Sequence, residues 1–365
     1  MTARLNLNLL PPSHTPLKRI DPVPSTERLQ ITVPPETQAT VRADRLVKQH
    51  LPFLSRRTIE NWFALKAVRI QGRPISKGYQ AAAGQVLEIQ LPAPLAEVPL
   101  PDPEVPLSIV YEDPELLILA KPGLLPTHPL DPFEKGTLVN ALRAVFPRIQ
   151  GVGDRLLEPG LVHRLDRGTS GLLAVTLTQT SWNQAKKDLA ARKWEKTYKA
   201  LVRGRVETPL FIDLPLAHDP KDEGKMKVVS PEDRKIRGRP YPALTRIRPL
   251  KVFPDHTLVE IDLVTGVTHQ IRVHLAWAGH PLVGDERYGG PPAPLYGLPE
   301  GRFFLHAARL SLPHPKTGQK MSFALPLPED LKGVVFRVHT ETMSKSSRGM
   351  KNRRRFPSPR RAHTM

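Results

Sequence analysis

The chain has 365 residues, of which 39% are hydrophobic and 24% charged, a composition typical of a soluble globular protein with two or three domains. It has no cysteine, so disulfide bonds and cysteine-bound metals are excluded. No apolar run has the length of a membrane helix, and the Pro-rich, polar N-terminus is unlike a signal peptide, so we expect a cytoplasmic protein without a membrane partner. The formal net charge of +19 predicts a polyanionic partner, with nucleic acid as the first candidate.

The basic charge is not confined to one end of the chain. Residues 344–365 carry eight lysines and arginines and no acidic residue, which accounts for +8 of the net charge of +19. The rest of the chain therefore has a net charge of +11. A solubilising tail would therefore explain only part of the charge. An anionic membrane surface is the weaker alternative, because no basic amphipathic helix supports it.

Proline-rich segments flank a small module near the N-terminus. Seven prolines among polar residues predict that residues 1–35 are disordered. Residues 36–92 are predicted to form an α/β module. The proline-rich residues 93–106 then predict a stiff linker.

Within this module the pattern predicts two helices and three strands. The first helix is expected over residues 41–51, and Ser55 is a suitable N-cap for the second. A strand, turn and strand are expected over residues 68–75, and residues 85–91 alternate polar and apolar residues as a strand does.

Two arginines, Arg56 and Arg57, fall in the first turn of the second predicted helix. Cations are unfavourable beside the positive end of a helix dipole. An oxyanion such as phosphate bound at that end would reverse this cost. We therefore expect both arginines to contact a phosphate group of the nucleic acid that the net charge predicts as a partner.

Residues 107–335 are predicted to form a second, larger domain of strands, turns and helices, which would be the catalytic domain, and residues 336–365 are predicted to be a basic disordered tail. Strands are expected at 108–111, 116–120, 172–175, 196–203, 256–264, 303–312 and 320–326. Helices are expected at 137–146, at 181–193 with Ser181 as its cap, and at 269–278 with Thr268 as its cap.

The segment with the most distinctive chemistry is residues 161–175. Its single carboxylate, Asp166, lies between Arg164 and Arg167, and an apolar strand begins at Leu172. Polar loops carried by rigid strands are where catalytic groups usually lie. This loop is therefore the candidate active site, although a solvated surface turn would have the same sequence pattern.

Three other kinds of site are disfavoured. His269 and His274 are five residues apart, which does not place both on one helix face with His163 as a third metal ligand. Ser170 with His163 as its base lacks the Gly-x-Ser-x-Gly turn of a nucleophile elbow. Glycine-rich nucleotide-binding loops are also absent from the sequence.

Several motifs in a fixed order resemble those of the RluA-type pseudouridine synthases. They are Tyr111-Glu112-Asp113, Lys121-Pro122-Gly123, His163-Arg164-Leu165-Asp166, Lys196-Thr197-Tyr198, Thr268-His269-Gln270-Ile271-Arg272, Gly284-Asp285 and Leu305-His306-Ala307. Residues 41–91 resemble, less strongly, the RNA-binding module of the ribosomal-protein S-four type.

The resemblance implies an α+β fold with a central mixed, largely antiparallel sheet. It implies a monomeric isomerase that converts uridine to pseudouridine in RNA without a cofactor or metal. Ribosomal RNA is the first expected substrate and transfer RNA the second. Asp166 matches the catalytic aspartate; attack on C1′, attack on C6 and assisted elimination all remain open.

The resemblance also assigns roles to other residues. Tyr198 matches the tyrosine that packs on the base and is a candidate proton acceptor, and Arg272 matches the basic partner of the aspartate. Arg164 matches the residue that fills the gap left by a flipped uridine, and Leu305 the apolar residue on the other face of the base. Further expected RNA contacts are His163, Thr169 and His269.

Three positions depart from the family pattern. Val267 replaces an arginine, Arg167-Gly168 replaces Lys-Asp, and Lys66 replaces a turn glycine at which a left-handed residue costs about 1–2 kcal/mol. The departures at Val267 and Lys66 keep open a second hypothesis, a non-catalytic RNA-binding or ribosome-assembly factor with the same fold. None of them removes Asp166, so we expect an active enzyme.

Overall fold

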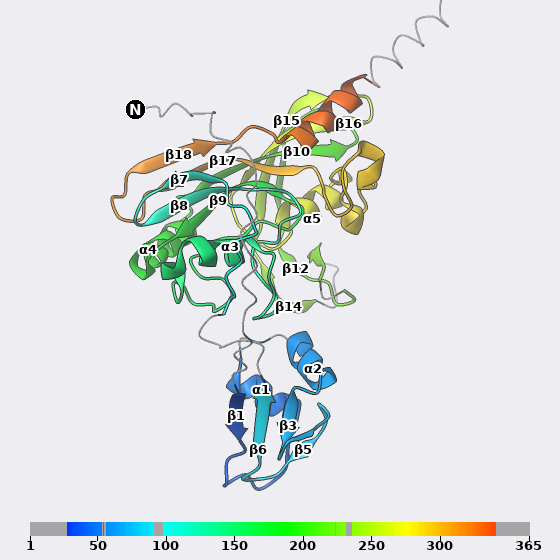
Figure 1. Cartoon of the computed structure of the whole chain (residues 1–365). Helices are drawn as coiled ribbons and strands as arrows, with labels where there is room; N and C mark the ends of the chain where they lie inside the picture. Colours follow the sequence, from blue (N-terminus) through cyan, green and yellow to red (C-terminus); the bar gives the residue numbers. More distant parts are fainter. Residues whose placement is uncertain are drawn as a thin grey trace, which may run out of the picture. The chain divides into compact units, whose positions relative to one another are not determined.

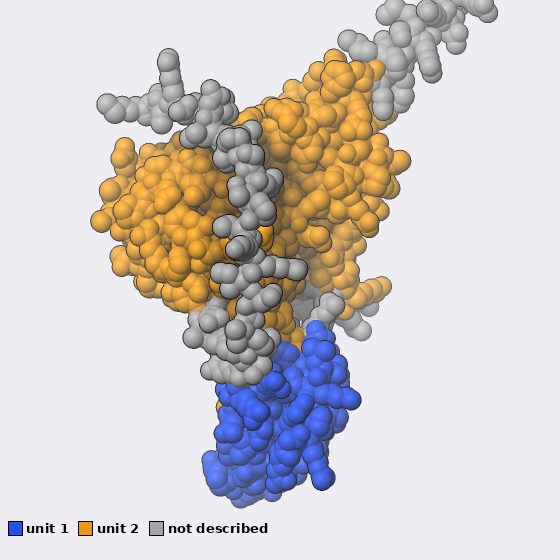
Figure 2. All heavy atoms as spheres, viewed as in Figure 1, with its two compact units in different colours: residues 1–46, 60–96 blue, residues 47–59, 97–365 orange. Residues whose placement is uncertain are grey.

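The computed structural model describes residues 28–52, 54, 56–90, 98–222, 224–230 and 236–340. The chain divides into two compact units, residues 1–46 with 60–96 and residues 47–59 with 97–365 (Figure 2). The predictions for residues 1–27, for Ser55 and for the tail from residue 341 lie outside the described residues, as does the side chain of Arg57.

The first unit contains a four-stranded antiparallel sheet in the order β1-β6-β3-β4 (Figure 1). Its strands are β1 Arg28–Thr32, β3 Val68–Ile70, β4 Arg73–Pro74 and β6 Val86–Gln90, and a separate pair joins β2 Val41–Arg42 to β5 Gln80–Ala81. The helices are α1 Ala43–His50 and α2 Arg56–Ala64, and the division between the two units falls within both. The strands predicted over residues 68–75 and 85–91 are confirmed.

Strand β1 corrects the prediction that residues 1–35 are disordered. Residues 28–32 pair with β6, and Ile31 is buried opposite Leu87. The high proline content of the segment concealed this short strand. The turn after α2 keeps the left-handed conformation although its residue is Lys66, whose φ is 58°.

The second unit is built around a nine-stranded sheet in the order β11-β15-β16-β10-β17-β9-β8-β7, with β18 paired to β17 (Figure 1). Neighbouring strands are antiparallel except for β9 and β17, which are parallel. The strands are β7 Ile109–Glu112, β8 Leu116–Lys121, β9 Ser170–Thr176, β10 Glu195–Arg203, β11 Leu210–Asp213, β15 Leu244–Val252, β16 His256–Leu263, β17 Leu305–Pro313 and β18 Lys320–Ala324. This mixed, largely antiparallel sheet confirms the expected α+β architecture.

Helices and a second, smaller sheet complete this unit. The helices are α3 Leu138–Val145, α4 Gln179–Ala190, α5 Gln270–Trp277 and a further helix over residues 329–340. The smaller sheet joins β12 Leu216–His218 to β13 Met226–Val228 and β14 Arg237–Tyr241. No helix in the described part of the chain is long and apolar enough to cross a membrane.

Two helices begin differently from the prediction. Thr178, not Ser181, caps α4, because the Thr178 Oγ1 accepts a hydrogen bond from the Ser181 N–H at 3.2 Å. The Ser181 hydroxyl instead donates to Glu115. Before α5 the capping position belongs to His269, and its side chain makes no capping hydrogen bond, so the predicted cap at Thr268 is wrong.

The described part of the predicted linker, residues 98–106, is bound to α3. The Asn140 Nδ2 donates to the Leu100 carbonyl at 2.7 Å, and the Asp102 N–H donates to the Asn140 carbonyl at 2.9 Å. Because Asn140 is fully buried, this stretch belongs to the second unit and is not a free linker.

The C-terminal helix corrects the predicted boundary of the tail. Residues 336–340 continue the helix over 329–340, whose Leu331, Val334 and Val338 are buried in an apolar cluster. The same spacing of three and four residues should have predicted this helix.

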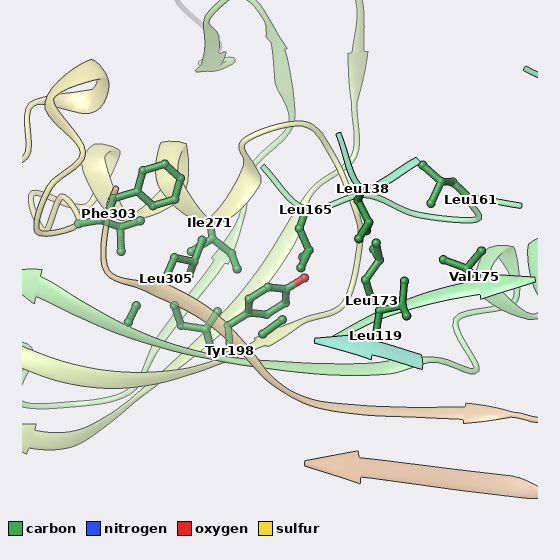
Figure 3. Close-up of a cluster of buried hydrophobic side chains, with 14 of the residues drawn as sticks. Leu119, Leu138, Leu161, Leu165, Leu173, Val175, Tyr198, Ile271, Phe303 and Leu305 are labelled. Carbon is green, nitrogen blue, oxygen red and sulfur yellow. The ribbon is translucent and has the colours of Figure 1, made fainter. Parts of the chain in front are cut away.

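The largest apolar cluster joins the elements that carry the candidate site. It brings together Leu165 from the loop before β9, Tyr198 from β10, Ile271 from α5, and Phe303 and Leu305 at the start of β17 (Figure 3). Close packing of this kind holds side chains in defined rotamers. The polar ends of these elements are therefore held in a fixed arrangement.

Candidate active site

The candidate loop borders a cavity of about 520 Å³ in the second unit. This volume is within the range of small-molecule sites. The residues that line it include Arg164, Asp166, Lys196, Tyr198 and His269. Residues from the loop, β10 and the start of α5 thus meet at one cavity, although Leu161 and His269 lie 108 positions apart in the sequence.

Asp166 and Arg272 form an ion pair at this cavity. The Arg272 Nη1 lies 3.1 Å from the Asp166 Oδ2. The arginine side chain is buried, whereas that of Asp166 remains 28% exposed. A carboxylate held at one oxygen by a fixed cation can still reach a substrate with its other oxygen.

A second carboxylate, that of Asp285, binds the two guanidinium nitrogens of Arg272 that do not contact Asp166. The Asp285 Oδ2 accepts from the Arg272 Nε at 2.7 Å, and the Asp285 Oδ1 accepts from the Arg272 Nη2 at 2.8 Å. The planar group of Arg272 also lies 4.4 Å from the ring centroid of Phe303 and 4.9 Å from that of Tyr288. Burial opposes the charge of Arg272, but hydrogen bonds and attraction from both carboxylates outweigh it and raise its pKa.

His269 is oriented by a short chain of hydrogen bonds. The Met226 N–H donates to the Tyr288 hydroxyl at 3.0 Å, and this hydroxyl lies 2.8 Å from the His269 Nδ1. This contact through Nδ1 fixes the orientation of the imidazole ring and leaves its other nitrogen, Nε2, available for another contact. That Nε2 faces the Asp166 Oδ2 at 3.9 Å. Burial, reinforced by Arg272, lowers the pKa of His269 despite the attraction of Asp166.

Tyr198 lies with its ring against Leu165 and Leu305 (Figure 3). Only 5% of the residue is exposed. Burial and the negative charge of Asp166 both raise the pKa of the Tyr198 hydroxyl. A phenolate is therefore disfavoured at neutral pH, so the geometry supports packing on the base more than proton removal by the free enzyme.

Arg164 lies at the edge of the cavity and is held by two neighbours. Its Nη1 is 3.1 Å from the Glu158 Oε1 and 3.2 Å from the His128 Nε2. The same Glu158 oxygen also accepts from Arg155 at 3.1 Å. The side chain of Arg164 is 41% exposed, so it can leave these contacts without crossing the core.

Two of the predicted RNA contacts have structural roles in the loop. The His163 Nε2 accepts from the Ala174 N–H at 3.0 Å, and burial, with the nearby lysines, lowers the pKa of His163 to about 3. Thr169 is buried, and its N–H donates to the Asp166 carbonyl at 3.0 Å. The first contact holds the loop against β9, and the second closes a turn within the loop.

The remaining predicted contacts lie outside the cavity lining. Leu305 is buried in the apolar cluster and is not among the residues that border the cavity. Arg56 is exposed in the first turn of α2.

The sequence did not predict that Lys121 and Thr127 hold the backbone of the loop through hydrogen bonds. The buried Lys121 donates to the Arg167 carbonyl at 3.3 Å, and the Thr127 hydroxyl donates to the Leu165 carbonyl at 2.6 Å. Burial and the charge of Arg302 lower the pKa of Lys121 to about 7. The motif that contains Lys121 was a signal for this role, whereas Thr127 had none.

Arg302 connects the loop to the helix over residues 329–340. This buried guanidinium donates to the Gly168 carbonyl, to the Ser170 hydroxyl at 2.9 Å and to the Asp330 Oδ2 at 2.7 Å. Asp330 belongs to the C-terminal helix. A lone arginine next to a phenylalanine pair gives no sequence signal for such a contact.

Comparison with known proteins identifies the family. Residues 115–277 match the family described as RNA pseudouridylate synthase. An uncharacterised RNA pseudouridine synthase of Chloroflexus aurantiacus is 39% identical over 84% of this chain and 92% of its own. An uncharacterised RNA pseudouridine synthase of Bacillus subtilis is 34% identical over 82% of this chain and 95% of its own. The ribosomal large subunit pseudouridine synthase D of Escherichia coli is 34% identical over 85% of this chain and 94% of its own. The chain belongs to the RluA-type family of RNA pseudouridine synthases.

Proposed function

We propose that this RNA pseudouridine synthase modifies uridines in structured RNA, with ribosomal RNA as the first candidate and transfer RNA as the second. The observation that carries the proposal is the ion pair of Asp166 with Arg272 in a cavity that also contains Tyr198. The name of the Escherichia coli relative supports ribosomal RNA. We expect a cytoplasmic monomer.

In the proposed reaction, Asp166 is the catalytic carboxylate. The bond between N1 of uracil and C1′ of the ribose breaks, the base turns, and C5 bonds to C1′. The proton on C5 is then lost and N1 gains one, so that the product is an isomer of the substrate. Arg272 keeps the carboxylate oriented, and the ring of Tyr198 packs on the base while it turns.

Arg164 has a separate proposed role in opening the RNA. Extrusion of a base costs a few kcal/mol, and a planar guanidinium can replace part of the lost stacking. For this, Arg164 exchanges its contacts with Glu158 and His128 for the RNA. The module of the S-four type would bind a neighbouring part of the substrate through Arg56 and Arg57.

The assignment of Asp166 is tested with purified full-length protein, ribosomal RNA and transfer RNA. Pseudouridine is mapped by carbodiimide modification after reaction with the parent and with Asp166→Asn. We expect product with the parent and a rate lower by more than about a thousandfold with the variant, because the neutral amide of asparagine replaces the reacting carboxylate.

Glu207→Gln serves as the matched control, because the side chain of Glu207 is 65% exposed and does not border the cavity. Its rate should equal that of the parent. Parental product from Asp166→Asn would show that another residue is catalytic. Tight RNA binding by the parent without product on either RNA would support the non-catalytic alternative.

A further inference from the structure

Lys196 is a buried cation of the cavity to which the reaction gives no role. It lies on β10 two residues before Tyr198, so both side chains point to the same side of the strand. Only 8% of the residue is exposed, and its side chain borders the cavity. Among the described residues, none forms a hydrogen bond or ion pair with its ammonium group.

Such a group is unfavourable in the free protein. Buried charges in proteins are normally paired, because desolvation is not otherwise offset. Burial alone lowers the pKa of Lys196 to about 8, so the ammonium form still predominates at pH 7. In the described part of the chain, this buried positive charge therefore stays without a partner.

Three carboxylates border the cavity, those of Asp154, Glu158 and Asp166, and none of them forms an ion pair with Lys196. Arg272 binds the carboxylate of Asp166, and two arginines bind that of Glu158. His163 is neutral, and the positive charges of Lys196 and Lys186 contribute to lowering its pKa. This part of the cavity consequently favours an anionic ligand.

Gly266 leaves space beside the ammonium group. A Cβ at this position would lie 3.3 Å from the Lys196 Nζ, which is tighter than ordinary contact. The backbone of Gly266 is not left-handed, so its conformation does not require glycine. The absence of a side chain keeps the approach from the cavity to Lys196 open.

We propose that Lys196 binds a phosphodiester group of the substrate RNA, next to the target uridine, in the space beside Gly266. This inference rests on the proposed function, since RNA is the polyanion that enters the cavity. The bound phosphate would supply the missing partner of Lys196. The phosphate would reach Lys196 only when the target nucleotide lies in the correct position over Tyr198 and Asp166, so only correctly placed RNA would gain this binding free energy.

The test compares Lys196→Met, Lys196→Arg and Gly266→Ala in the full-length protein with the RNA that the parent modifies. We expect Lys196→Met to lower kcat/KM about tenfold to a hundredfold, mainly through KM, since a hydrogen bond to a charged group is removed. The slope of log affinity against log salt should flatten by about 0.7–0.9, the value for one phosphate contact. Lys196→Arg should retain the slope, and Gly266→Ala should raise KM although the charge remains.

Lys187→Met is the matched control, because this lysine is exposed on α4 and does not border the cavity. It should keep the parental KM. The thermal unfolding midpoint of Lys196→Met without RNA should equal or exceed that of the parent, since an unpaired buried charge is removed.

Parental KM and salt slope in Lys196→Met would overturn the inference. A fall in kcat alone would also overturn it and would assign Lys196 to the chemical step. If the parent formed no pseudouridine, the proposed function would fail, whereas the salt slope of RNA binding would still test Lys196.

Discussion

Two of the three guanidinium nitrogens of Arg272 bond Asp285, and the third bonds Asp166. With only the ion pair to Asp166, the long side chain could rotate about several bonds. The bidentate contact to Asp285 and the two aromatic rings remove this freedom. Asp285 is therefore a positioning residue that acts through Arg272.

Replacement of Asp285 by asparagine tests this role. We expect Asp285→Asn to lower kcat about tenfold to a hundredfold with little change in KM, because a bond to a charged group is weakened. The unfolding free energy should fall by about 3 kcal/mol, the cost of breaking a buried pair. Steady-state kinetics and urea unfolding measure the two effects.

Asp222→Asn is the control, because Asp222 also pairs with an arginine but its side chain is 50% exposed. Its unfolding free energy should change by less than about 1 kcal/mol. If Asp285→Asn lost stability but kept the parental kcat, Asp285 would be a structural residue only.

Single residues of the site were predictable to different degrees. The motifs identified Asp166, Tyr198 and Arg272, and the structure places all three at or beside one cavity. They also contained Asp285, but the sequence does not show that the turn after α5 brings it back to Arg272. The half-buried position of His163 was not predictable either, because a histidine in a polar loop is expected to be exposed.

At the scale of elements, the connection between the loop and β9 depends on a neutral histidine. The His163 Nε2 accepts the Ala174 N–H, so protonation of this nitrogen would break the bond. The pKa of His163 is about 3 in the folded protein, against about 6.5 in an unfolded chain. As the pH falls below 6.5, the unfolded state binds a proton that the folded state does not.

Acid should therefore destabilise the second unit through this residue. The contribution of His163 is present above pH 6.5 and is lost as the pH falls towards 3, by about 3 kcal/mol between pH 6.5 and pH 4. Urea unfolding of the parent and of His163→Gln at several pH values measures it. The variant should show a shallower decline with falling pH.

His280→Gln should decline as the parent does, because His280 lies at a surface turn after α5. An identical pH dependence in the parent and in His163→Gln would show that the loop does not depend on a neutral His163.

Strands and helices with a clear periodic pattern of apolar residues were predictable, whereas elements whose bounds depend on contacts with distant residues were not. The period of two predicted β10 and β16; β16 is buried at alternate residues, whereas β10 is buried on both faces. The strands between residues 210 and 252 were missed, since several are short and β15 has an exposed end. The start of α4 was not predictable because Thr178 and Ser181 are both suitable caps. The Ser181 hydroxyl donates to Glu115, more than 60 residues away, and the sequence does not show this contact.

At the scale of the whole molecule, the basic residues from 344 to the C-terminus lie beyond the described helix. Deletion of residues 344–365 should flatten the dependence of RNA affinity on salt by about 0.7–0.9 in the log–log slope for each phosphate that the tail neutralises. Turnover at saturating RNA should be unchanged, since no residue of the site is removed. Filter binding at several salt concentrations and single-turnover rates measure both.

A variant in which the same eight cations are replaced by glutamine separates charge from chain length. It should match the deletion. An unchanged salt slope in both proteins would show that the tail does not touch RNA.

The bond between Arg302 and Asp330 has a consequence for the order in which the enzyme becomes complete during synthesis. The residues from Asp166 to Arg272 leave the ribosome well before Asp330, on which the buried Arg302 depends for its ionic partner. A nascent or prematurely terminated chain that ends before Asp330 contains every reacting group, yet its loop lacks this support. The loop therefore acquires this support only after the chain has been synthesised as far as Asp330 and the helix over residues 329–340 has packed.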